Sequence, residues 1–150
     1  MKTITISALL FAGSLGSHAQ PMQNQLLREA RKAIEASNLI YSDLANKNDG
    51  SILSRYTEDA CLLPPNSPPL CGREAVLNFF KDGPKVNSKF TIINVFGDGK
   101  EYVTEESHYE LFDLAGKKMD EGKILVLWKK TKDGWKMHRD MFSSNRQQNK

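Results

Sequence analysis

Residues 89–145 read KFTIINVFGDGKEYVTEESHYELFDLAGKKMDEGKILVLWKKTKDGWKMHRDMFSSN, and this stretch decides the fold. It is rich in β-branched and aromatic residues, and three pairs of turn residues divide it: Asp98-Gly99, Ala115-Gly116 and Asp133-Gly134. Such pairs suit the tight connections of β-hairpins. The pattern predicts four consecutive antiparallel strands, at about residues 89–97, 102–113, 119–131 and 134–143.

The chain before this stretch has the pattern of a helix. From Gln25 to Lys47 apolar side chains recur every three or four positions, with charged residues between them. This spacing predicts one helix with a single buried stripe. Asn48-Asp49-Gly50 ends the helix, and Asp49 can cap a short second helix. The stripe consists of Leu27, Ala30, Ile34, Ser37 or Tyr41, and Leu44.

Further elements lie between this helix and the meander. The second helix would carry Ile52, Leu53 and Tyr56 on one face, and a brief strand would follow at 60–63. A third helix is predicted at 73–80, with Phe79 and Phe80 facing inward. Helices followed by an antiparallel meander predict an α+β fold, with the helices laid on one face of the sheet.

The first 19 residues have the features of a secretory signal peptide. One basic residue, Lys2, precedes an apolar run of about a dozen residues, and small residues stand before Gln20 at the −3 and −1 positions. The alternative is a membrane anchor, which needs about 20 apolar residues. We therefore expect a periplasmic or secreted protein with no membrane segment after cleavage. The predicted division is 1–19 signal peptide, 20–32 lead-in and start of the first helix, 33–145 domain and 146–150 polar tail.

Charge and cysteine content limit the partners and the compartment. Loss of Lys2 with the signal lowers the formal charge from +3 to +2, which gives no electrostatic case for nucleic acid. The two cysteines, Cys61 and Cys71, flank a proline-rich loop. In an oxidising compartment they could form a disulfide across that loop, or they could be two buried thiols.

Several motifs together resemble the nuclear transport factor 2-like superfamily, in particular its SnoaL-like, ketosteroid-isomerase-like branch. The resemblance runs from about residue 33 to 145. It implies a cone-shaped single domain, with three N-terminal helices packed on a curved, mainly antiparallel sheet that encloses a pocket. It says little about activity, because this fold hosts isomerases, cyclases, dehydratases and plain binding modules. The motifs are Asn38 and Tyr41, the run 56–65, Gly72-Arg73-Glu74-Ala75-Val76, Gly122-Lys123, Trp128-Lys129-Lys130, Asp133-Gly134-Trp135-Lys136, Asp140 and Ser144-Asn145.

The resemblance also bears on assembly and on one pocket position. Relatives often pair through their sheets, which implies a homodimer. The apolar run from Ile124 to Trp128 agrees with a strand covered on both faces, although a central strand of a monomer would look the same. Relatives often carry a tyrosine where this chain has Ile124, so a polar group that lines the pocket elsewhere is absent here.

The last strand supplies the candidate catalytic residues, Asp140 and His138. Alternation places His138, Asp140 and Phe142 on one face. Active members of the fold commonly place an acid–base carboxylate on the inner face of the sheet, and Asp140 matches such a position. Desolvation would raise its pKa and make it a usable base near neutral pH. The alternative role for Asp140 is a buried hydrogen-bond acceptor.

Other candidates line the expected pocket. On the strand 102–113, Glu105 and Tyr109 share a face with Val103, Ser107 and Leu111, and a shift of one residue would turn Glu106, His108 and Glu110 inward instead. Asn38 could bind a ligand carbonyl or cap a loop. Tyr41, Tyr56, Trp128 and Phe142 would be wall residues, and the two tyrosines could equally be simple packing.

The sequence indicates neither a metal nor a cofactor. His108 and Glu110, like His138 and Asp140, are pairs without a third ligand at metal spacing. Three functions remain open. The first is binding of an unknown small apolar or amphipathic molecule without catalysis. The second is a ketosteroid-isomerase-like, dehydratase or cyclase enzyme with Asp140 as the general base, and Tyr109, Asn38 or His138 polarising a carbonyl. The third is protein interaction through the outer face of the sheet.

Overall fold

The computed structural model describes residues 19–146. The predicted signal peptide therefore lies outside the described residues except for Ala19, and so do residues 147–150 of the predicted tail. Among the described residues, no helix combines the length and the apolar character that a membrane span requires.

Six strands form one mixed sheet in the order β2-β1-β6-β5-β4-β3. The four long strands β3 to β6 are consecutive and antiparallel, so the predicted meander is confirmed. The strand β1 runs parallel to β6 and antiparallel to the two-residue strand β2. The bounds are β1 Tyr56–Leu63, β2 Leu70–Cys71, β3 Asn87–Gly97, β4 Tyr102–Phe112, β5 Lys118–Thr131 and β6 Gly134–Ser144.

The helices differ from the predicted set of three. The first predicted helix is two segments, α1 Ala19–Leu39 and α2 Tyr41–Lys47, because the backbone at Ile40 (φ −99°, ψ 0°) leaves the helical conformation. The second is only a short 3₁₀ helix, η1 Ser51–Arg55, because the chain becomes extended at Tyr56. The third is α3, Arg73–Asp82, close to its predicted bounds. The α+β class is confirmed, and a count of three helices is not.

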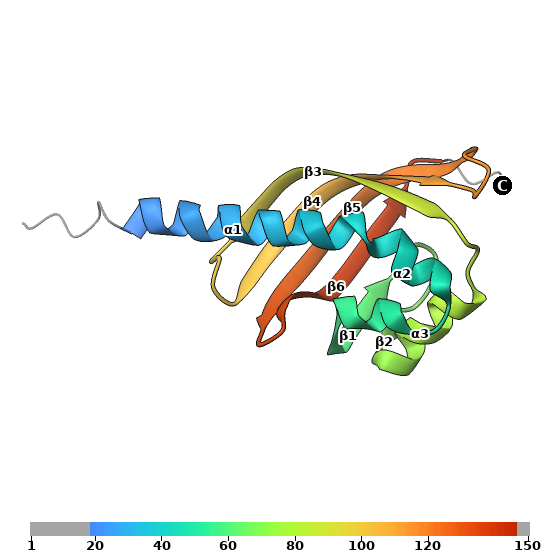
Figure 1. Cartoon of the computed structure of the whole chain (residues 1–150), viewed down its shortest axis with the longest axis horizontal. Coiled ribbons are helices and arrows are strands. Elements are labelled where there is room, and N and C mark those ends of the chain that lie inside the picture. The colour runs from blue at the N-terminus through green and yellow to red at the C-terminus, as the bar shows by residue number, and fades with distance from the viewer. Residues whose placement is uncertain (1–18, 147–150) are drawn as a thin grey trace, which may run out of the picture.

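The helix α1 lies across one face of the sheet (Figure 1). Its predicted stripe is confirmed, since Ala30, Ile34 and Ser37 are all buried. The guanidinium group of Arg31 donates to the backbone oxygen of Ile92 in β3 (3.0 Å), which fixes the helix against the sheet. The turn after Leu39 sends α2 in a new direction, and the Tyr41 ring there packs edge-on against Phe90 of β3.

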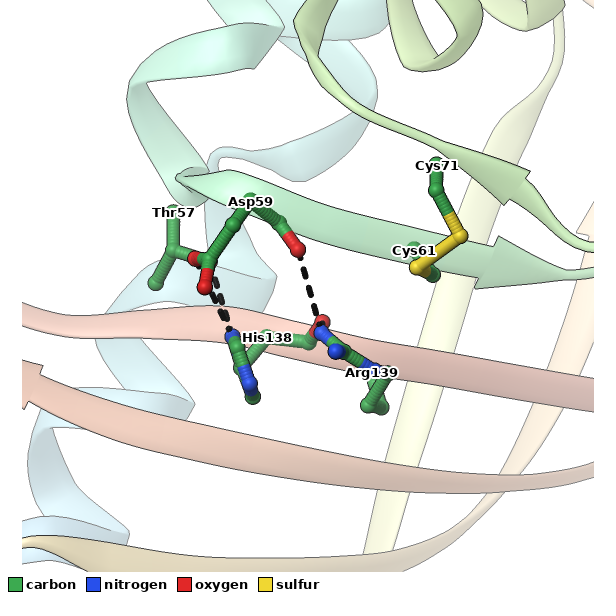
Figure 2. Close-up of a disulfide and its surroundings, with 6 residues drawn as sticks. All are labelled: Thr57, Asp59, Cys61, Cys71, His138 and Arg139. Carbon is green, nitrogen blue, oxygen red and sulfur yellow. Dashed lines mark hydrogen bonds and ion pairs between the residues drawn. A yellow bond between two sulfur atoms is a disulfide. The ribbon is translucent and has the colours of Figure 1, made fainter.

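A disulfide joins Cys61 in β1 to Cys71 in β2, the bridged alternative of the two that the sequence left open (Figure 2). The two residues are direct partners in the antiparallel pair, with their Cα atoms 4.0 Å apart. Closing a loop of this length stabilises a folded chain by about 2–3 kcal/mol. The bridge holds the proline-rich loop and the start of α3 beside the edge of the sheet.

Candidate functional site

A cavity of about 350 Å³ lies between the inner face of the sheet and the helices α2 and α3. Its volume is at the lower end of the range for small-molecule pockets, about 300–1000 Å³. The exposed residues of its lining come from the ends of α2 and α3 and from the α3–β3 connection, so the cavity opens there. The walls are mainly apolar, with seven aromatic side chains: Tyr41, Phe79, Phe80, Phe90, Tyr109, Trp128 and Phe142.

Two carboxylates stand in one row on the floor of this cavity. In the register of the sheet, Val126 of β5 is paired with Glu105 of β4 on one side and with Asp140 of β6 on the other. One strand separates the two acids, so their backbones are about 10 Å apart. The predicted inner face of β4 is confirmed, since Val103, Glu105, Ser107 and Tyr109 are all buried.

Glu105 is a fully satisfied acceptor. One carboxylate oxygen accepts from the amide of Asn38 (2.9 Å) and the hydroxyl of Ser107 (2.6 Å). The other oxygen accepts from the indole nitrogen of Trp128 (2.9 Å). The side chain is only 1% exposed. Asn38 lines the cavity, and its amide is engaged with Glu105.

Asp140 is buried but much less satisfied. The hydroxyl of Tyr56 donates to Oδ2 (2.8 Å), and the hydroxyl of Tyr41 lies 3.5 Å from that of Tyr56. The other carboxylate oxygen, Oδ1, accepts no hydrogen bond from the described residues. Every fully buried polar side-chain atom among these residues has a partner, so Oδ1 is not fully buried. It is open to the cavity that Asp140 lines. Desolvation by burial, together with the charge of Glu105, raises the pKa of Asp140 to about 6 despite the opposing hydrogen bond from Tyr56.

The prediction that His138 shares a face with Asp140 and Phe142 is wrong. A β-bulge shifts the pairing of β6 with β5: Trp128 pairs with Met137 and Leu127 with Arg139, which leaves His138 as the extra residue. His138 lies away from the cavity, with Nδ1 3.0 Å from the Thr57 hydroxyl and 3.4 Å from the Asp59 carboxylate (Figure 2).

The remaining predicted residues are walls or supports. The Tyr109 hydroxyl donates to Asp120 (2.9 Å), and its ring lies so close to Gly122 that a Cβ there would come within 2.7 Å of it. Phe142 packs edge-on against Tyr109. Tyr56 stands behind Asp140 instead of lining the cavity, and burial raises its pKa well above the ordinary value.

The sequence left some of the lining unassigned. Phe79 and Phe80 were expected to face inward from the third helix, and the structure places both on the cavity. Phe90 belongs to the same wall, and nothing in the strand pattern of the sequence marks it as a lining residue. Lys81 and Lys85 stand at the mouth, and no spacing pattern marks an exposed lysine as a rim residue. Across residues 19–146, no three His, Cys, Asp or Glu side chains are arranged to hold a metal ion.

No protein-family model matches this chain, and no curated protein matches it. Solved structures do. A ketosteroid isomerase-like protein from Erwinia carotovora atroseptica is 21% identical, with a TM-score of 0.62 over 77% of this chain and 96% of its own. A nuclear transport factor 2-like protein of unknown function from Shewanella oneidensis is 19% identical, with a TM-score of 0.63 over 75% and 98%. A nuclear transport factor 2-like protein with a cystatin-like fold from Novosphingobium aromaticivorans is 16% identical, with a TM-score of 0.61 over 88% and 92%.

These likenesses establish the fold. The chain has the nuclear transport factor 2-like fold, as its sequence motifs implied.

The burial of Asp140 predicts a pH-dependent stability. Its pKa is about 6 in the folded protein and 3.8 as the ordinary value, so between these pH values the folded state holds the proton more tightly. The stabilisation is complete below pH 3.8 and is lost as the pH rises through 6. We expect Asp140→Asn to remove this dependence.

Urea unfolding from about pH 4 to about pH 7 measures this dependence: the parent should lose about 2 kcal/mol relative to Asp140→Asn over this range. Asp133→Asn, in an exposed turn, is the control and should follow the parent. A difference between parent and Asp140→Asn that stays constant with pH would contradict the assignment.

Proposed function

We propose that this protein binds a small, mostly apolar molecule in its cavity, with a polar group of the ligand hydrogen-bonded to Asp140. The observation that carries the proposal is Asp140 Oδ1, an acceptor that faces an aromatic cavity and has no partner among the described residues. Because Oδ1 is open to the cavity, a wholly apolar ligand would bury it without a partner, and burying a polar atom in this way is costly. A ligand that donates to Oδ1 would remove that cost and bury its apolar part against the aromatic walls.

A second function, general acid–base catalysis, is favoured by one specific property of the same residue. The pKa of Asp140 is about 6, close to the range in which a side chain can both take and return a proton at neutral pH. In this alternative Asp140 takes a proton from the bound molecule, and the Tyr56 hydroxyl orients the carboxylate by its bond to Oδ2. His138 has no part in it, because the bulge turns it away from the cavity.

A screen of small aromatic and alicyclic compounds by thermal shift tests the binding function. Ala45 lines the cavity on α2, so Ala45→Trp would fill it near the mouth. We expect one class of compounds to raise the melting temperature of the parent by several degrees and to have no effect on Ala45→Trp. Ala36→Trp, on the exposed side of α1, is the matched control and should respond as the parent does.

Two results would contradict the proposal. One is the absence of any stabilising compound for the parent. The other is an undiminished response in Ala45→Trp, which would place the binding outside the cavity.

We also propose that the chain is exported to the periplasm or secreted. The disulfide between Cys61 and Cys71 supports this, since such bridges persist in oxidising compartments. Intact-mass measurement on the exported protein should find Gln20 as the first residue and no free thiol. Ala19→Arg, which removes the small residue before the cleavage site, should retain the signal. Recovery of the parent with residues 1–19 attached would count against export.

A homodimer formed through the outer face of the sheet is proposed as the assembly. On that face Leu125 of β5 and Met141 of β6 are direct partners, and their side chains are 42% and 46% exposed. Ile93 of β3, Leu63 at the end of β1 and the loop residue Pro65 lie along the same groove. An exposed apolar surface on a sheet is typical of an interface, and the alternative of a different protein partner would use the same face.

Sedimentation equilibrium tests this assembly. We expect Leu125→Lys to convert the dimer to a monomer with unchanged circular dichroism. Leu39→Lys replaces an exposed leucine of α1 and should remain a dimer. A parent protein that sediments as a monomer would exclude the dimer and favour a different partner for this face.

A further inference from the structure

We infer that the ligand of the cavity is an organic amine: an ammonium group that binds Asp140, carried by a small aromatic or alicyclic body that contacts the walls. This inference rests on the proposed binding function and names the chemical class of its ligand. Three features of the cavity lead to it: the charge of its floor, the bonding of each acid, and the nature of its walls.

The floor of the cavity carries acids without a cation. Glu105 and Asp140 stand in the same row of the sheet. In the described part of the chain, the cationic residues of the lining are Lys81 and Lys85, and both are exposed at the mouth. Nothing on the inner end of the cavity therefore balances the two acids. A ligand that brings a positive charge to this end would supply the missing counter-ion.

The two acids differ in how well they are satisfied, and this difference selects Asp140. Glu105 accepts three hydrogen bonds from neutral donors, one each from α1, β4 and β5. Asp140 accepts one, from Tyr56, and its Oδ1 is open to the cavity. Asp140 lacks a hydrogen-bond donor to Oδ1 and a positive charge to balance its own. An ammonium group supplies both, whereas a hydroxyl group supplies only the donor.

The walls suit the same class of ligand. Seven aromatic side chains line the cavity, from α2, α3 and all four long strands. The face of an aromatic ring attracts a cation, and the rings also bury an apolar body. A carboxylate at the floor would instead add a third negative charge beside Glu105 and Asp140. The cavity therefore discriminates against acids at its inner end.

Matched ligands that share one body test the inference. Isothermal titration near neutral pH compares tryptamine, its alcohol counterpart tryptophol and the acid indole-3-propionate. We expect tryptamine to bind at least about tenfold more tightly than tryptophol, and the acid to bind most weakly. Asp140→Asn should bring tryptamine and tryptophol to within about threefold of each other. Asp133→Asn, which removes a carboxylate from an exposed turn, should keep the preference of the parent.

The dependence on pH gives a second and independent readout. The groups that face Asp140 are Tyr56 from β1, Tyr41 from α2 and Glu105 from β4. The helix α3 contributes Phe79 and Phe80 to the lining, and its Lys81 stands at the mouth with Lys85. Burial raises the pKa of both tyrosines, so they stay neutral.

Protonation of Asp140 removes the charge that binds the ammonium group. The affinity for tryptamine should fall about tenfold from about pH 7.5 to about pH 5, and that for tryptophol should not. The fall should be absent in Asp140→Asn. A fall that persists in this variant would assign the effect to Glu105 and overturn the inference.

The remaining outcomes separate the inference from the function on which it rests. Binding of tryptophol or indole-3-propionate as tight as that of tryptamine overturns the amine and leaves a small-molecule cavity. If none of the three compounds binds, the amine is also overturned. The proposed function then depends on the compound screen with Ala45→Trp and Ala36→Trp.

Discussion

The buried carboxylate of Glu105 is the contact on which the cavity depends. It accepts from Asn38 near the end of α1, from Ser107 on its own strand and from Trp128 on β5. Because the helix breaks two residues after Asn38, this bond fixes the point from which α2 departs. The position of Tyr41, and with it the helical wall of the cavity, follows from that anchor. A buried charge held by three donors is stable only while all three remain in place, so it also makes the arrangement specific.

The two acids on the floor of the cavity differ in their hydrogen bonding. They lie on the same face of the sheet, in the same row and at similar depth, yet one is surrounded by donors and the other is not. The row alone would not distinguish them. The neighbouring side chains do, since Asn38, Ser107 and Trp128 all point to Glu105, and only Tyr56 reaches Asp140. The less satisfied acid is the one with capacity left for a ligand.

Much of the fold could be read from the sequence, because its signals are local. Turn pairs and β-branched runs predict the meander, and period-two alternation on β4 correctly places Glu105 and Tyr109 on the inner face. Other features depend on pairing and packing that no local pattern encodes. The start of β1 was not predicted because Glu58 and Asp59 are poor strand formers, and it is the pairing of Tyr56 with Met137 of β6 that places this end of β1 in the sheet. The break at Ile40 leaves the helical spacing intact and therefore has no signal.

The bulge in β6 is the feature with the largest consequence, and it decides the charge of the cavity. Trp135 and Met137 face inward before it, and Asp140 and Phe142 do so after it. With regular alternation from Met137, the next inward residues would be Arg139 and Met141, and Asp140 would point away. The cavity would then hold Glu105 beside a cation, a balanced pair with no need of a charged ligand. One extra residue, His138, exchanges an arginine for an aspartate on the floor, so the row holds two acids.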